Sequence, residues 1–194
     1  MWLPNELLEQ ESHMKSIGMT MSASDIYSIN SGSLKDAIVH FGGFCTGEVI
    51  SDQGLVLTNH HCGYSAIQSH SSVQNDYLKN GFWAKSFSEE KPNEGLFVDF
   101  IVSIDDVSKT IQNFIAEGLS QKEAIDTFLQ VNPTIGKSMR SEIKPIYFGN
   151  QFIRVISQRY SDIRLVGAPP SLIGKFGADT DNWVWPRHTG DFSF

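Results

Sequence analysis

The sequence has no excess of basic residues, no long apolar run and only two cysteines, and each shortage excludes a class of protein. The 194 residues include 15 lysines and arginines against 22 aspartates and glutamates, a net charge of -7. Nucleic-acid-binding domains carry the opposite excess. No apolar run approaches the roughly 20 residues of a membrane-spanning helix. Residues 1–4 lead directly into acidic and polar residues, without the apolar stretch of a signal peptide. We therefore expect neither a nucleic-acid partner nor a membrane span.

The residues that are present predict a mainly β protein. Hydrophobic residues make up 40% of the chain, enough to bury a core. Runs rich in Val, Ile, Phe and Thr at 36–51 and 55–61 flank the turn Asp52-Gln53-Gly54 and predict a hairpin. Further strand-like runs lie at 95–104, 141–149, 151–160 and 162–168. Apolar spacing predicts short helices at the N-terminus and around 105–131, where Gly118 ends one helix and Ser120 caps the next.

The stretch "TNHHC", residues 58–62, places two histidines directly before a cysteine. A zinc site could draw on His60, His61, Cys62 and His70. Neighbouring residues of a strand point to opposite faces, however, and zinc ligands are usually spaced by two to four residues. A metal site is therefore the weaker interpretation, and we expect no cofactor. The two cysteines alone fit either one disulfide or two free thiols.

The segment "CTGEVISDQGLVLTNHHC" resembles the layout of chymotrypsin-like serine proteases. In that layout a cysteine starts a strand, a tight turn follows, and the next strand ends in Thr-x-x-His-Cys. The resemblance implies a disulfide between Cys45 and Cys62, and it identifies His61 as the general base. A general base needs a fixed orientation toward its nucleophile, which a neighbouring disulfide helps to maintain.

A histidine base also needs a carboxylate to orient it. Asp191 precedes the apolar "FSF" near the end of the chain, as an aspartate that opens a strand would. Asp162 opens another strand-like run, and Asp179 and Asp181 are further candidates. Position alone leaves the choice open.

Several longer motifs together resemble the bacterial dipeptidyl-peptidases of the dipeptidyl-peptidase 7 and dipeptidyl-peptidase 11 type, which are chymotrypsin-related serine exopeptidases. The resemblance covers practically the whole chain. The motifs are "FGGFCTGEVIS", "LTNHHCGYSAIQSHSS", "NDYLKNGFW", "LVGAPPSLIGKFG" and "DTDNWVWPRHTGDFS".

This resemblance implies a role for individual residues. It assigns the catalytic histidine to His61 and the catalytic aspartate, in the Gly-Asp-Phe motif, to Asp191. It assigns binding of the substrate's free amino terminus to Asn182 and Trp183. An amide oxygen can accept from a buried ammonium, and an indole face attracts a cation. It further implies peptide substrates, a homodimer, and a location in the periplasm or at the cell surface of a Gram-negative bacterium.

The chain also departs from the family pattern. The nucleophilic serine of a Gly-Asn-Ser-Gly-type motif has no counterpart, since Ser33 follows a glycine but lies in the amino-terminal region. We therefore expect residues 1–194 to form the incomplete first barrel of a double β-barrel, without the second barrel and the helical cap. The alternative to a peptidase is a β-barrel binding module without catalytic activity.

Overall fold

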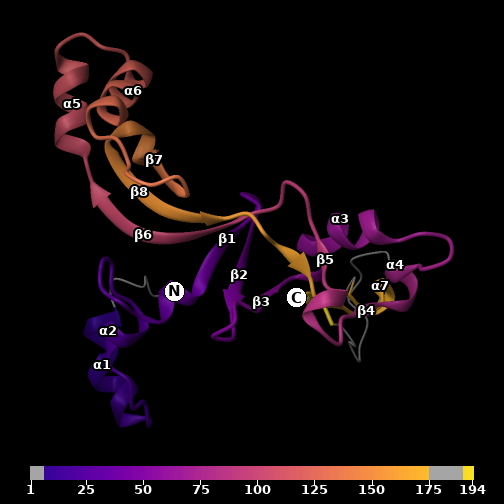
Figure 1. Cartoon of the computed structure of the whole chain (residues 1–194). Coiled ribbons are helices and arrows are strands. Elements are labelled where there is room, and N and C mark those ends of the chain that lie inside the picture. Colours follow the sequence, from indigo (N-terminus) through magenta and orange to yellow (C-terminus); the bar gives the residue numbers. More distant parts are fainter. Residues whose placement is uncertain (1–6, 175–189) are drawn as a thin grey trace. The chain divides into compact units, whose positions relative to one another are not determined.

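The computed structural model describes residues 7–174 and 190–194 and divides the chain into two compact units. Unit 1 comprises Met1–Asp36 and Asp99–Arg159, and unit 2 comprises Ala37–Val98 and Tyr160–Phe194. Both units combine strands with helices (Figure 1). In this described part of the chain, no helix has the length and apolar character needed to cross a membrane.

The helices are mostly short. They are α1 (Leu7–Ser16), α2 (Ala23–Ile26), α3 (His60–His70), α4 (Tyr77–Asn80), α5 (Ser108–Ala116), α6 (Gln121–Val131) and α7 (Ser171–Gly174), with single 3-10 turns at Leu34–Ala37, Phe87–Glu89 and Tyr147–Gly149.

The strands vary from two to ten residues. They are β1 (Ile38–Phe41), β2 (Cys45–Val49), β3 (Val56–Thr58), β4 (Phe82–Trp83), β5 (Lys91–Pro92), β6 (Val98–Asp106), β7 (Met139–Ile146), β8 (Gln151–Tyr160), β9 (Arg164–Leu165) and β10 (Gly167–Ala168).

Unit 1 is built from local hairpins. Strand β7 pairs antiparallel along its whole length with residues 151–158 of β8, and β8 lies between β7 and β6. Helices α5 and α6 form a helical hairpin, in which Gly118 has a positive φ of 104°. Ser120 then begins α6 with the predicted capping interaction: its side chain accepts from the Glu123 amide, and the Glu123 carboxylate accepts from the Ser120 amide.

The core of unit 1 lies between these two helices and the β7–β8 hairpin. Its fully or nearly fully buried side chains come from both helices and both strands. They are Ile111, Ala124, Phe128, Ile143 and Phe152. The apolar spacing that predicted the two helices therefore reflects one face packed on a sheet.

Unit 2 contains the predicted hairpin and the residues of interest. Three of its strands lie side by side in the order β3-β2-β1, all antiparallel. The turn between β2 and β3 is closed by the Ile50 amide, which donates to the Leu55 carbonyl at 2.9 Å, and Gly54 has the expected positive φ of 81°. A second core joins α3 to the short strands through Ile67, Leu165 and Ala168.

Two sequence predictions about unit 2 were wrong in detail. The run 162–168 does not form one strand: β9 pairs with β5 and β10 pairs with β4. Residues 58–61 do not end a strand at the histidines, because β3 stops at Thr58 and α3 begins at His60.

Candidate active site

The two adjacent histidines occupy the first turn of helix α3. Asn59 is the N-cap residue, with an extended backbone (φ -70°, ψ 148°). Successive residues of a helix are rotated by about 100°. His60 and His61 therefore point in different directions, as expected, although the predicted reason, alternation along a strand, was wrong. His60 is fully buried, whereas the His61 side chain is 64% exposed.

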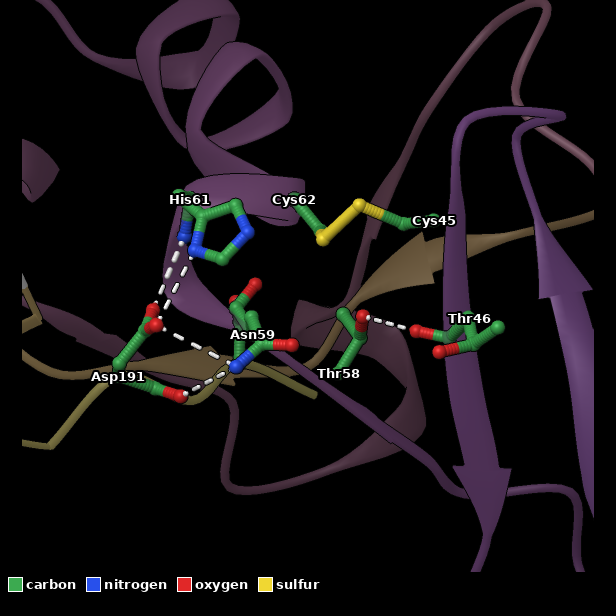
Figure 2. The surroundings of a disulfide bond; sticks show 8 residues. Cys45, Thr46, Thr58, Asn59, His61, Cys62 and Asp191 are labelled. Atoms are coloured by element: carbon green, nitrogen blue, oxygen red, sulfur yellow. Dashed lines mark hydrogen bonds and ion pairs between the residues drawn. A yellow bond between two sulfur atoms is a disulfide. The ribbon is translucent and has the colours of Figure 1, made fainter. Parts of the chain in front are cut away.

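His61 faces Asp191 through both its backbone and its ring (Figure 2). The His61 amide donates to Asp191 Oδ1 at 3.2 Å, and His61 Nδ1 lies 3.1 Å from Asp191 Oδ2. The Asp191 side chain is only 10% exposed. A proton on Nδ1, donated to the carboxylate, leaves the lone pair of Nε2 available to accept a proton from a substrate or a nucleophile.

Backbone hydrogen bonds hold the segment that carries Asp191. The Ser193 amide donates to the Thr58 carbonyl at 2.7 Å, and the Thr58 amide donates to the Ser193 carbonyl at 2.9 Å. Phe194 pairs in the same way with Gly167, donating at 2.8 Å. These bonds attach the segment to β10 and to the end of β3, which stops one residue before the N-cap of α3. The carboxylate and the histidine therefore meet although they are 130 positions apart.

A disulfide joins Cys45 to Cys62 (Figure 2). It links the start of β2 to the first turn of α3, directly after His61. Both cysteine sulfurs lie close to a ring nitrogen of His61, but a disulfide offers no thiolate for zinc. The other two histidines of the zinc alternative contact neutral side chains: His60 Nε2 lies 3.1 Å from Ser171 Oγ, and His70 Nε2 lies 3.0 Å from Asn93 Oδ1.

The competing aspartate Asp162 is engaged elsewhere. It accepts two hydrogen bonds from Arg164, each of 2.8 Å, and this pairing holds the pKa of the Asp162 carboxyl below its ordinary value. The other candidates of this region lie outside the described residues. They are Asp179 and Asp181, together with the two residues expected to bind the substrate's amino terminus, Asn182 and Trp183.

Sequence reasoning missed three residues around the pair. Asn59 Nδ2 lies 3.3 Å from Asp191 Oδ2. Ser193 is 2% exposed, and its hydroxyl donates to the Asn59 carbonyl at 3.2 Å. Gly63 leaves room for this serine, because a Cβ at position 63 would lie 2.6 Å from Ser193 Oγ. All three contacts depend on the pairing of distant segments, so no local pattern signals them.

Comparison with known proteins places these features in a family context. The family model described as Peptidase S46 matches residues 1–194. An Asp/Glu-specific dipeptidyl-peptidase of Flavobacterium psychrophilum is 53% identical over 200 residues, covering 100% of this chain and 28% of that protein. Dipeptidyl-peptidase 7 of Phocaeicola vulgatus is 48% identical over 206 residues, covering 100% of this chain and 29% of that protein.

A solved structure shares the arrangement of the chain. The crystal structure of Porphyromonas endodontalis DPP11 in complex with the dipeptide Arg-Glu superimposes with a TM-score of 0.86 at 46% identity. The match covers 100% of this chain and 29% of that one. The chain thus spans less than a third of the length of the relatives that it matches.

Proposed function

Since this chain belongs to the peptidase S46 family, we propose that it is the amino-terminal part of a serine peptidase that releases dipeptides from the free amino terminus of peptides. The observation that carries the proposal is the contact between His61 Nδ1 and Asp191 Oδ2 at 3.1 Å. A histidine oriented by a nearly buried carboxylate is the proton-transfer half of a Ser-His-Asp triad. Relatives that bear dipeptidyl-peptidase names supply the substrate class.

In the proposed reaction, a serine of the longer protein attacks the carbonyl carbon of the second residue. His61 Nε2 takes the hydroxyl proton and then gives it to the departing amine, so that the dipeptide remains as an ester on the serine. Water, deprotonated by the same nitrogen, hydrolyses this ester. Asp191 keeps the imidazole in the required tautomer and stabilises its protonated form. The second barrel of the double-barrel fold would supply the serine and the donors that stabilise the oxyanion.

Asn182 and Trp183 are proposed to bind the ammonium group of the substrate. An exopeptidase must measure two residues from a charged end, and this requires acceptors placed at a fixed distance from the serine. For the second residue of the substrate, we propose a preference for Asp or Glu. The relatives named Asp/Glu-specific are 47–55% identical to this chain, whereas those named dipeptidyl-peptidase 7 are 41–48% identical.

The disulfide supports an extracytoplasmic location, because such bonds persist mainly in oxidising compartments. We therefore propose the periplasm or cell surface as the location. The proposed assembly of the longer protein is a homodimer, which rests on the family resemblance alone.

The test uses the longer protein and fluorogenic dipeptidyl substrates, each with a free or an acetylated amino terminus. We expect a strong preference for the free amine, which Asn182→Ala narrows, and faster cleavage after Glu than after Leu. A fluorophosphonate probe should label one serine. Equal cleavage of acetylated substrates would refute the exopeptidase assignment, and absence of both labelling and cleavage would favour the binding-module alternative.

A further inference from the structure

The N-cap residue of helix α3 does not cap its own helix. An asparagine at this position usually accepts a hydrogen bond from an amide of the first turn. In unit 1, Ser120 caps α6 in this way, and in unit 2 Asp76 caps α4 by accepting from the Lys79 amide at 2.9 Å. Within the described residues, the Asn59 side chain makes no such bond to α3.

The Asn59 side chain instead turns toward Asp191 (Figure 2). Its Nδ2 lies 3.3 Å from Asp191 Oδ2 and 3.4 Å from the Asp191 carbonyl oxygen. The amide at the start of α3 that such a cap would serve, that of His61, is satisfied by Asp191 Oδ1. Asp191 thus takes over the capping of α3, and Asn59 becomes a donor to the residue that caps its helix.

The backbone of Asn59 is itself held in place. Its carbonyl accepts from the Cys62 amide at 3.0 Å and from the Gly63 amide at 3.2 Å, and also from the Ser193 hydroxyl at 3.2 Å. Cys62 is further restrained by the disulfide. The Asn59 amide group therefore projects from a fixed point between the helix that carries His61 and the segment that carries Asp191.

We propose that Asn59 is a positioning residue that fixes the Asp191 carboxylate in the orientation that His61 requires. A carboxylate turns readily about its Cβ–Cγ bond, and only one of its oxygens faces the imidazole. The His61 amide restrains Oδ1, and Asn59 Nδ2 restrains Oδ2, the oxygen that His61 Nδ1 also contacts. A neutral amide adds a donor without adding a charge that would compete for the carboxylate. This inference rests on the proposed function of the His61–Asp191 pair.

Two substitutions separate this role from capping. Asn59→Ala removes the donor. Asn59→Asp keeps the shape and is as good an N-cap residue as asparagine, but it replaces the donor with an acceptor that repels Asp191. The matched control is Asn93→Ala, which removes an asparagine–histidine contact at the opposite end of α3, where Asn93 Oδ1 meets His70.

In the longer peptidase, we expect Asn59→Ala to lower kcat roughly 10- to 100-fold with KM within about twofold, the pattern of a group that acts on the chemical step. Asn59→Asp should lose at least as much, and Asn93→Ala should match the wild type. In the same longer peptidase, the downfield proton signal of His61 Nδ1 should be present in the wild type and in Asn93→Ala, and weakened in both Asn59 variants. Circular dichroism of each variant checks that it is folded.

Failure of the proposed function and failure of the positioning role of Asn59 would give different results. If His61→Ala leaves kcat unchanged, the proposed function itself fails. If His61→Ala abolishes turnover while folded Asn59→Asp keeps the wild-type kcat and the downfield signal, the positioning role of Asn59 is overturned and the proposed function stands. If Asn59→Asp does not fold, Asn59→Ala decides, and an unchanged kcat in that variant likewise overturns the inference.

Discussion

Different kinds of contact stabilise unit 1 and unit 2, each within itself. In unit 1, neighbouring segments fold onto each other: α5 onto α6 and β7 onto β8, around one apolar core. In unit 2, the decisive contacts join distant segments. They are the Cys45–Cys62 disulfide, the Thr58–Ser193 bridge and the His61–Asp191 contact. The difference shows that unit 1 is stabilised by segments close together in the sequence, whereas the candidate active site of unit 2 depends on a few contacts between segments far apart.

The apolar core of unit 1 is the place where one substitution should cost most stability. Phe152→Ala removes a fully buried ring and should lower the free energy of unfolding by about 3–5 kcal/mol. The matched control is Phe148→Ala, at the turn of the same hairpin, where the ring is fully exposed and the expected change is within about 0.5 kcal/mol. Urea denaturation followed by circular dichroism measures both. Similar losses for the two phenylalanines would mean that the core does not hold unit 1 together.

The disulfide should provide the second-largest effect, this time in unit 2. It closes a loop of 17 residues. Replacing both cysteines by alanine should therefore cost about 3 kcal/mol by restoring the freedom of the unfolded chain. Thiol titration of the denatured, unreduced wild type should find no free thiol. Two titratable thiols would contradict the bond and would make Cys62 available again for the zinc alternative.

Replacing one glycine by alanine in each unit should lower the free energy of unfolding by a similar amount. Gly118→Ala in unit 1 forces alanine into a left-handed conformation with open space around it, at about 1–2 kcal/mol. Gly63→Ala in unit 2 gains helix propensity of about 1 kcal/mol but pushes against Ser193, and overpacking costs about 1–3 kcal/mol.

Turnover should separate these two glycine variants. We expect kcat of the longer peptidase to fall in Gly63→Ala, because Ser193 belongs to the segment that places Asp191, and to stay near the wild type in Gly118→Ala. Loss of kcat in both variants, or in neither, would show that space at Gly63 does not control the position of Asp191.

The smallest expected effect concerns the cap of α6. The Ser120 hydroxyl and then the Ser120 amide donate to the Glu123 carboxylate and hold its pKa below the ordinary value. The pKa of Glu123 is lower in the folded chain than in the unfolded chain. The contribution of the cap to stability is therefore complete above the ordinary pKa of glutamate, and it is lost as the pH falls through the lower pKa of the folded state. Carboxyl-carbon NMR of Ser120→Ala should show this pKa rising toward that of an unperturbed glutamate. An unchanged Glu123 pKa in Ser120→Ala would show that the Ser120 hydroxyl does not lower it.

Local patterns in the sequence predicted unit 1 well. The helices around 105–131, the cap at Ser120 and the strand at 151–160 all follow from apolar spacing and capping preferences within a few residues. The same was true in unit 2 of the turn at Gly54.

The start of α3 was not predictable in this way. A histidine pair after a strand-like run has no helical signal of its own, and the partner that satisfies the first turn of this helix, Asp191, comes from the other end of the chain. The resemblance to a family identified Asp191, whereas position along the chain did not distinguish it from Asp162. The role proposed for Asn59 could not be inferred without the structure, because its side chain faces a residue 132 positions away.

We infer that Asp191, and not another carboxylate, orients His61. The most direct measurement compares kcat of the longer peptidase carrying Asp191→Asn with kcat of the same protein carrying Asp162→Asn, two isosteric substitutions in unit 2. We expect kcat to fall about 10⁴-fold in Asp191→Asn, as when a triad aspartate is neutralised. We expect kcat to stay within about twofold of wild type in Asp162→Asn, because an exposed ion pair with Arg164 contributes little. A kcat for Asp191→Asn close to that of the wild type, or an equal loss in Asp162→Asn, would contradict this inference.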